Sequence, residues 1–409
     1  MAESERTKRL IQRWRTLEQN RGPWKQHWED CARVMNPRRL GFVSQTTPGD
    51  RRTEGLYDGT PMQAARGLAN AIGGLLRPDG QDWRQLKVAG DEGGLDDEGR
   101  DWIAATDARF EKALDEPKAR VRQATGEVDL DLVVFGTGTL FVGEAPSLGR
   151  LLFQSLHLKD SVVVFGDSGD PEGMFVARRF TLRNAEARFG RNLLSEPTRK
   201  KIEEAKTPDE TIEVLHAVVP RQEGRPGAML KANMPYAEIW IEVEAGHEIQ
   251  VGGFHEFPFV VPRFDTSSGE DYGRSPGMIA LPDANTLQAM GETLLVAGQR
   301  AADPPTFAPY DGAINEMHTM PGGIAYYDAE LAKELGRIPI GPMPTGGDIP
   351  LTRDMQQDMR EQVRRDAGLA ENGYAEAVAA DDDGAALAAL LQKIMGKASA
   401  VPTGRTRPV

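Results

Sequence analysis

The sequence predicts an α+β protein, and three observations support that class. Helical periodicity dominates residues 5–134, whereas residues 140–262 consist of short apolar runs separated by Gly, Asp and Pro turns. A run with almost no helix breakers then extends from Met278 to Ala302, enough for a helix of about 37 Å. A second helical run, Asp348–Asp366, follows a segment dense in proline and glycine. Helices and strands segregated along the chain are typical of the α+β class.

Two apolar stripes predict that residues 5–35 form one amphipathic helix or a broken pair. The break would lie at Asn20–Pro23, between a stripe around Trp14 and another around Trp28. Basic residues outnumber acidic ones from Arg6 to Arg39. This excess could mark a nucleic-acid or partner patch, although a solvated helix face is the more common reason.

The next elements are predicted from capping signals and periodicity. Thr60 is expected to cap a helix with Pro61 in its first turn, because both residue types are favoured there. Small residues fill this helix, and no Lys-Ser or Lys-Thr follows its glycines, which indicates close helix packing instead of a phosphate-binding loop. The predicted elements are helices at Met62–Leu76, Leu95–Asp115 and Ala119–Val134, with a short strand around Trp83–Val88.

The pattern of short apolar runs in residues 140–262 predicts an antiparallel β domain that helices cover. A helix at Leu182–Phe189 and a charged segment at Glu196–Lys206 interrupt the strands, and Ala245-Gly246 is expected to turn a hairpin. The predicted strands are Leu140–Glu144, Leu151–Leu156, Ser161–Phe165, Met174–Phe180, Glu213–Arg221, Ala237–Glu244, His247–Gly252 and Phe257–Val261.

The two long helical runs differ in their surfaces. The first carries one apolar stripe and otherwise small residues, so that neighbouring backbones can approach closely. The second has a narrow stripe at Leu351, Met355, Met359 and Val363, and charged residues cover the rest. A monomer buries so thin a stripe poorly, and we expect this helix to pack between identical neighbours. The residues expected to pair across that inter-subunit seam are Arg360, Glu361, Arg364 and Arg365.

The segments beside the second run carry little regular structure. Strand-like pieces at Phe307–Gly312 and Gly323–Tyr327 precede it, and their edges are expected to pair with a neighbouring subunit. Behind it, Gly368–Asp383 reads as an acidic loop, Ala385–Met395 as a short helix, and Lys397–Val409 as a disordered tail.

Composition excludes several classes of protein. The chain has 409 residues, of which 39% are hydrophobic, which suffices for two or three cores and is unlike a disordered protein. No apolar run approaches the roughly 20 residues of a membrane span, and no secretory signal follows the polar N-terminus. The single cysteine, Cys31, excludes an internal disulfide and fits a reducing compartment. The net charge of −13 argues against a tight DNA binder, which usually has a basic face.

No catalytic, metal or cofactor site is expected. The six histidines are scattered, and no pair has the spacing of metal ligands. Neither the phosphate-binding loop of an ATPase nor the G-x-S-x-G elbow of a hydrolase is present. Spacing alone does not exclude a carboxylate nuclease site, but no motif supports one. We therefore expect a protein that is not an enzyme.

Several short motifs, taken in their order along the chain, resemble one family. They are Asn20–Trp24, Arg51-Arg52, Asp58–Pro61, Ala64–Ala69, Tyr272–Pro276, Asp303–Pro305 and Met320–Ile324. With them the chain resembles the portal, or head-to-tail connector, proteins of short-tailed bacteriophages over roughly residues 5–350. In that family a proline-bounded strand leads to a Tyr-Gly-Arg-Ser-Pro-like segment, a first stem helix, a Pro-Pro exit and a clip that ends in Pro-Gly-Gly.

The resemblance implies a portal fold with a helical and β wing domain, two long stem helices, a small β-rich clip and a reduced or absent crown. The implied boundaries are 1–262 for the wing, 263–302 for a loop and first stem helix, 303–347 for the clip, 348–367 for the second stem helix, 368–384 for a tunnel loop, and 385–409 for a short C-terminal helix and tail.

The implied function is a ring-shaped channel at one capsid vertex, with twelve subunits expected, for genome packaging, retention and ejection. Double-stranded DNA would pass through it non-specifically. The implied partners are the terminase, the tail adaptor and the major capsid or scaffolding protein, with no membrane. The protein would reside in the virion and, during assembly, in the host cytoplasm. An acidic channel wall would repel phosphates and avoid stalling the duplex, although solubility explains the charge equally well.

The C-terminal part departs from the family pattern. A Thr-Ala-x-Glu-like segment and a long crown helix usually follow the second stem helix, and this sequence has neither. The candidate tunnel-loop residues, Glu371, Asn372, Tyr374 and Glu376, are therefore assigned by position alone. Two alternatives stay open: another virion ring such as a neck or adaptor protein, and a soluble α/β enzyme.

Overall fold

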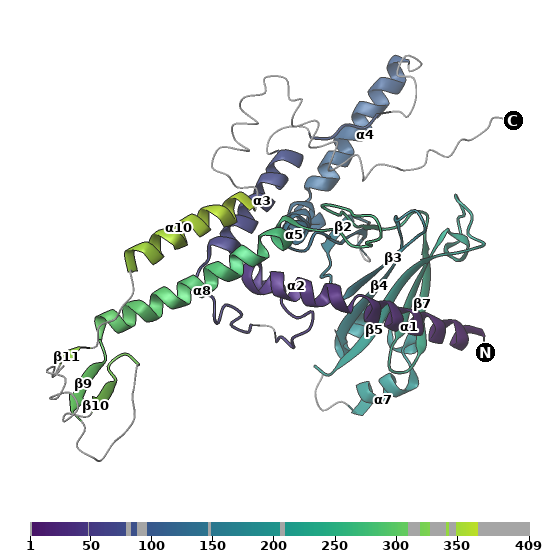
Figure 1. The fold of residues 1–409 in the computed structure, drawn as a ribbon. Helices are drawn as coiled ribbons and strands as arrows, with labels where there is room; N and C mark the ends of the chain where they lie inside the picture. Colours follow the sequence, from purple (N-terminus) through teal and green to yellow (C-terminus); the bar gives the residue numbers. More distant parts are fainter. Residues whose placement is uncertain are drawn as a thin grey trace.

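An elongated molecule emerges from the computed structural model, which describes residues 2–47, 49–78, 83–87, 96–145, 149–204, 209–309, 320–327, 341–342 and 349–366. Figure 1 shows a body of helices and sheets, a long helix that leaves this body, and a small sheet at the far end of that helix. Helices and largely antiparallel sheets occur together, so the predicted α+β class is confirmed.

Two N-terminal helices, α1 (Ala2–Asn20) and α2 (Gly22–Met35), form the predicted broken pair. Arg21 lies at the break and is only 3% exposed. Its guanidinium donates hydrogen bonds to the backbone carbonyls of Leu158, Lys159 and Ser161 at 2.6–2.8 Å. A buried arginine thus fixes the bend against the chain that precedes the main sheet. A short 3₁₀ helix, η1 (Pro37–Arg39), follows.

Three more helices, α3 (Thr60–Leu76), α4 (Asp97–Asp115) and α5 (Val121–Phe135), lie near their predicted bounds, with the 3₁₀ helix η3 (Pro117–Ala119) before α5. The prediction that Thr60 caps α3 is wrong. The helix already begins at Thr60, whose backbone N–H donates to Asp58 Oδ1 at 2.8 Å. The carboxylate two residues upstream is the acceptor, in the manner of an Asx turn.

The predicted strand around Trp83–Val88 is also wrong for its described part, because residues 83–87 form no strand. Arg84 instead lies against α4, where it donates to Asp107 at 2.6 Å and stands over the ring of Phe110. Val88 lies outside the described residues. The ion pair and the cation–π contact use side chains that the alternating pattern had assigned to a sheet.

Two antiparallel sheets occupy residues 140–260, as predicted, and α6 (Leu182–Phe189) and α7 (Glu196–Glu204) flank the larger one. The larger sheet has the order β3-β4-β5-β6-β7, and β6 and β7 form the predicted hairpin. The smaller sheet has the order β2-β1-β8. The strands are β1 (Leu140–Glu144), β2 (Leu151–Ser155), β3 (Ser161–Phe165), β4 (Pro171–Thr181), β5 (Thr211–Pro220), β6 (Tyr236–Glu242), β7 (His247–Phe254) and β8 (Phe259–Val260), and the 3₁₀ helices are η4 (Arg191–Leu193) and η5 (Lys231–Asn233).

The two long helices are present as predicted, α8 at Pro276–Ala302 and α10 at Ile349–Asp366. Between them in sequence lies a sheet of order β10-β9-β11, in which β9 and β10 are parallel and β11 is antiparallel to β9. Its strands are β9 (Thr306–Pro309), β10 (Ile324–Tyr327) and β11 (Gly341–Pro342). The candidate loop at 368–384 and the predicted C-terminal helix and tail at 385–409 lie outside the described residues.

The main core lies where α2, α3, α5 and the start of α8 meet the sheets. Its largest buried side chains include Trp28 and Phe135, and it continues into Met278, Ala280 and Ala284 of α8. The last buried residue of α8 is Leu287. The second half of the longest described helix therefore projects from the body, and of the described elements α10 makes the most extensive contact with α8.

The segment Tyr272–Pro276 joins α8 to the body. Tyr272 is buried among aromatic rings, with Trp28 edge-on at 5.0 Å between centroids. Gly273 lies against the backbone of Gly136, which ends α5 in a left-handed conformation with φ of 75°. A Cβ on either glycine would overlap the other's carbonyl oxygen. Two backbones thus touch at a point where no side chain fits.

Ser275 then starts α8 and ties it to α5. Its hydroxyl accepts from the N–H of Met278 at 2.9 Å, which is the N-cap geometry, and donates to the carbonyl of Val134 at 2.9 Å. Pro276 follows at the first helical position, where a missing N–H costs little. The Tyr-Gly-Arg-Ser-Pro motif is therefore a rigid anchor for the helix that projects.

Replacing Gly273 by alanine should lower the free energy of unfolding by about 3 kcal/mol, because the two backbones must separate. Gly298 is the matched control. It lies in α8 with open space around its Cα, and Gly298→Ala should raise the free energy of unfolding by about 0.5–1 kcal/mol. Urea denaturation measures both. A Gly273→Ala protein as stable as the unaltered chain would show that the two backbones are not held in contact.

Candidate functional site

The α8–α10 pair, named here the helix arm, is the candidate functional site. The two helices lie side by side and antiparallel, because Gly291 faces Gln356 while Asp283 meets Asp366 at the other end. Gln356 is buried against this contact although it is polar. The absence of a side chain on Gly291 lets α8 approach both Gln356 and Tyr57 closely.

A loop of the body holds α8 through hydrogen bonds between its backbone and the side chain of Gln288. The side-chain carbonyl of Gln288 accepts hydrogen bonds from the N–H groups of Tyr57 and Asp58, at 2.8 and 3.0 Å. The amide nitrogen of Gln288 donates to the carbonyl of Asp58 at 2.7 Å. One glutamine thus satisfies three backbone groups of the loop just before α3 starts.

The same loop fastens α10 through a charge. Asp58 is 7% exposed, and its Oδ2 accepts from Arg360 Nε at 2.8 Å while its Oδ1 accepts from the Thr60 N–H. Burial alone would raise the pKa of Asp58, but the hydrogen bonds from Thr60 and Arg360 hold its pKa below the usual value. Asp58 and Gln288 together form what we call the clasp, which ties both helices of the arm to the start of α3.

Charged residues are few on α8, and one of them lies beside a carboxylate of α10. Burial and the neighbouring carboxylate of Asp283 raise the pKa of Asp366 at the end nearer the body. Along α8 the only charged residues are Asp283, Glu292 and Arg300, although much of its second half is exposed. A solvated helix of this length usually carries far more charge.

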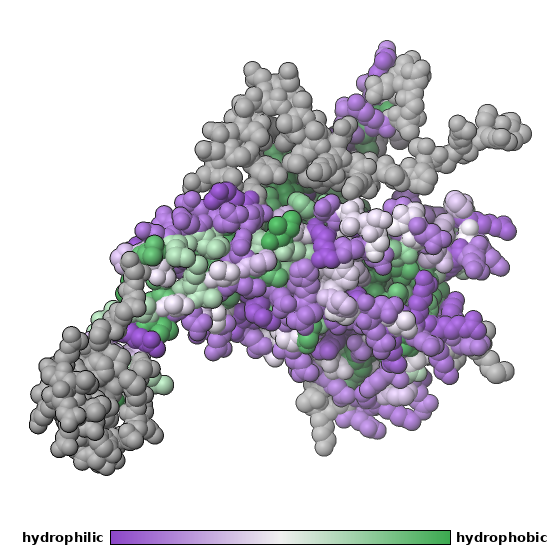
Figure 2. Space-filling view, in the orientation of Figure 1, coloured by the Kyte–Doolittle hydropathy of each residue, from purple (hydrophilic) through white to green (hydrophobic). Residues whose placement is uncertain are grey.

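Large apolar side chains are exposed on both helices of the arm. On α8, Ile279 is 72% exposed and Leu295 is 53% exposed. The predicted stripe on α10 is buried over only part of its length. Val363 is buried and Met359 is half-buried, whereas Leu351 is 56% exposed and Met355 is 50% exposed. Figure 2 shows apolar side chains on the surface of this arm. The thin stripe is therefore covered at one end and bare at the other.

The predicted site residues fall into three groups. Arg360 pairs with Asp58 of its own chain, which the sequence analysis did not foresee. Glu361, Arg364 and Arg365 are exposed, and their contact with a neighbouring subunit stays a prediction. The tunnel-loop candidates, Glu371, Asn372, Tyr374 and Glu376, lie outside the described residues.

Sequence reasoning missed the clasp. Asp58 stood in a recognised Asp-Gly-Thr-Pro motif, and its preference for accepting a backbone N–H two residues on was the available signal. Gln288 gave no signal, since a polar residue beside a helix stripe is ordinary. The partner of its amide is distant in sequence, and only the fold brings the two together.

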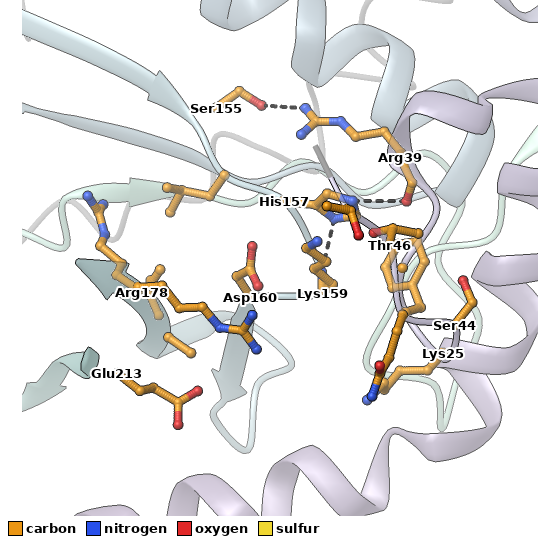
Figure 3. A pocket seen from close by; sticks show the side chains of 18 of the residues that line it. Lys25, Arg39, Ser44, Thr46, Ser155, His157, Lys159, Asp160, Arg178 and Glu213 are labelled. Atoms are coloured by element: carbon orange, nitrogen blue, oxygen red, sulfur yellow. Dashed lines mark hydrogen bonds between the residues drawn. The ribbon is translucent and has the colours of Figure 1, made fainter. Parts of the chain in front are cut away.

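A polar pocket of about 960 Å³ lies elsewhere, between η1, the loop after it, the end of β2 and β4, and Figure 3 shows it. His157 stands in its wall but is not a free base. Its Nε2 donates to the carbonyl of Arg39 at 2.9 Å, its Nδ1 accepts from the N–H of Lys159, and burial lowers its pKa to about 3. Both ring nitrogens are used, so the pocket lacks a histidine ready for acid–base catalysis.

Two other classes of site are absent from the part of the chain that the structure describes. Among the residues that the structure covers, no group of three or more His, Cys, Asp or Glu side chains is arranged to hold a metal ion. No described helix is both long and apolar enough to cross a membrane.

Comparison with known proteins identifies the family. The model of the family described as "Bacteriophage head to tail connecting protein" matches residues 7–370. The chain belongs to this head-to-tail connecting family. The resemblance noted in the sequence is thereby confirmed, and membership in a family of connecting proteins agrees with a structural instead of a catalytic role.

Two relatives are similar over most of the chain. The "Portal protein" of Salmonella phage epsilon15 is 26% identical over 338 residues, and the "Probable portal protein" of Bordetella phage BPP-1 is 24% identical over 335 residues. Each match covers 80% of this chain but 59% of the relative. The chain therefore matches somewhat more than half the length of these connecting proteins.

Asp58→Asn should lower the free energy of unfolding by about 1–3 kcal/mol at neutral pH, because an NH2 group replaces one of the two oxygens that accept from Thr60 and Arg360. The folded-state pKa of Asp58 is depressed, so its charge stabilises the protein above the usual aspartate pKa, and this contribution is lost as the pH falls through the folded-state value. The difference between variant and parent should therefore shrink below about pH 3.9.

The control is Arg13→Gln on the exposed face of α1, away from the arm, which should change the free energy of unfolding by no more than about 0.5 kcal/mol. Urea unfolding across a pH series measures both variants. A difference that stays constant down to the acid limit would contradict a role for the Asp58 charge.

Proposed function

We propose that the chain is a portal subunit. Copies of it assemble into a ring at one capsid vertex, and the ring is the channel through which the genome is packaged, retained and ejected. The observation that carries the proposal is the helix arm, in which α8 leaves the body after Leu287 with few charges and both helices expose apolar side chains. Family membership and the portal names of both relatives support it.

In this proposal the arm is the stem of the portal. Residues 1–262 are the wing, 263–302 hold a loop and the first stem helix, 303–347 the clip, and 348–367 the second stem helix. The small sheet at the far end of α8 supports the assignment of a clip to residues 303–347 (Figure 1). The tunnel loop at 368–384 remains assigned by position, and a reduced or absent crown remains part of the proposal.

The exposed apolar side chains of the arm form the contact between subunits in this proposal. Leu295 of one copy packs toward Leu351 and Met355 of the next, because these exposed apolar side chains lie on the two helices at the same end of the antiparallel arm. Two different surfaces meeting head to tail generate a ring when the rotation between copies closes. Twelve copies are expected from the family resemblance. The exposed charges of α10, among them Arg364 and Arg365, pair across the seam.

The proposed partners are those that the family resemblance implies. The clip at the far end of the stem meets the terminase during packaging and the tail adaptor afterwards, and the wing meets the major capsid or scaffolding protein. DNA passes without specific contacts, which suits a chain with a net charge of −13 because an acidic wall holds no phosphate tightly. The protein thus resides in the virion and, before assembly, in the host cytoplasm.

Arg364→Glu combined with Arg365→Glu should leave folded protein that no longer forms closed rings, because both substitutions reverse the charge on the seam. Negative-stain imaging and light scattering measure ring formation, and circular dichroism checks the fold. The matched control is Arg13→Glu combined with Arg15→Glu, two exposed arginines on α1 away from the arm, which should leave ring formation unchanged. Intact rings from the α10 variant would refute the seam.

A further inference from the structure

Strand β4, which lies between β3 and β5 in the larger sheet, has a free edge over part of its length. On one side β5 pairs with it from Met174 to Thr181. On the other side β3 begins at Ser161, opposite Val176, and the chain before Ser161 turns away. Residues 178–181 of β4 therefore have a strand on one side only among the described elements. An open edge presents backbone donors and acceptors to any extended chain.

The direction of these backbone groups can be read from two hydrogen bonds. The N–H of Ala177 donates to the carbonyl of Asp160 at 2.7 Å, on the β3 side. The N–H of Leu182 donates to the carbonyl of Glu210 at 2.9 Å, on the β5 side. Backbone groups alternate in direction along a strand, so the N–H and C=O of Arg179 point to the β3 side, where β3 has ended.

The polar pocket of Figure 3 adjoins this open edge. Residues 176–180 form one of its walls, and the loop after η1 and the end of β2 form others. At about 960 Å³ it has room for a segment of extended chain.

The pocket is basic although the protein is acidic. Five cationic side chains line it and two acidic ones, Asp160 and Glu213. The cations are Lys25, Arg39, Lys159, Arg178 and Arg179. Ion pairs with Glu18 and with Asp131 occupy the first two. Lys159 and Arg179 line the same space from different walls. Both positive charges act on Asp160, where they oppose the rise in pKa that burial causes. With Lys25 and Arg39 paired, three cations remain against the two carboxylates, and this local excess of positive charge in a chain of net charge −13 favours a ligand of opposite sign.

We propose that this pocket binds an extended acidic peptide segment of a partner protein, which adds as a strand to the free edge of β4. The backbone of Arg179 would supply the ladder hydrogen bonds, and Lys159, Arg178 and Arg179 would pair with the carboxylates. Main-chain pairing gives such an interaction its affinity, and the side-chain pockets give it selectivity. A nucleic acid has no peptide groups to match a strand edge, which favours a peptide.

Arg179 offers a way to separate backbone from charge. Arg179→Pro removes the outward N–H together with the charge, and proline is tolerated where a strand's N–H faces away from the sheet. Arg179→Gln removes the charge alone. Binding of a fluorescein-labelled peptide of alternating Glu and Val to the full chain, followed by anisotropy, should weaken about tenfold more in Arg179→Pro than in Arg179→Gln. Circular dichroism confirms that the proline variant is folded.

Lys159→Glu supplies a second test that does not alter the sheet. It should weaken binding of the acidic peptide, whereas Arg13→Glu on α1 should leave binding unchanged, and a peptide of alternating Lys and Val should not bind the parent protein. Equal binding by Arg179→Pro and Arg179→Gln would overturn strand addition. Equal binding of the acidic and the lysine peptide would overturn charge selection.

Two further outcomes would assign the pocket to a different occupant and so overturn the proposal. One is that single-stranded DNA binds with an affinity that depends on Lys159 while the acidic peptide does not bind. The other is that Arg179→Pro and Lys159→Glu change the number of copies in the assembly while the parent binds no peptide, which would mean that a second copy of the chain fills the pocket.

Discussion

The whole arrangement depends on one close contact between two backbones. Gly136 ends α5, Gly273 precedes α8, and neither position has room for a Cβ. This contact lets Ser275 reach the carbonyl of Val134 and cap α8 at the same time. A helix that projects from a body acts as a lever on its base, so the base must resist bending. Two backbones in van der Waals contact supply that stiffness, because no flexible side chain lies between them.

The clasp supports the arm at a second point. Gln288 holds α8 at the place where the core ends, and Asp58 holds α10 through Arg360. The two contacts differ in chemistry, because the glutamine forms hydrogen bonds with neutral backbone groups whereas the aspartate forms an ion pair with Arg360. The loop before α3 therefore sets both the position of each helix and the antiparallel pairing between them. An arm held at its base and at its middle presents its outer half in a fixed orientation.

The sequence predicted the elements well and the contacts poorly. Periodicity located α6 and α8 because helix stripes and proline stops are local signals. It placed a strand around Trp83–Val88, where Arg84 instead contacts Asp107 of α4. It also assigned the cap of α3 to Thr60 instead of the Asp58 carboxylate two residues upstream. Arg360 was expected to face a neighbour, yet its partner Asp58 is in its own chain and distant in sequence. Long-range pairs of this kind leave no trace in local spacing.

The distribution of charge gives the surfaces their separate tasks. The chain has a net charge of −13, yet cations gather around one strand edge and α8 has few charges. Solubility alone does not explain so uneven a distribution of charge. Apolar side chains left bare on a rigid arm tend to associate with a surface of the same kind, and identical copies supply one. The basic pocket beside the open strand is a separate surface, because its lining residues belong to the body and not to the arm. In the proposals made above, the two surfaces have different partners: a second copy for the arm and an acidic chain for the strand edge.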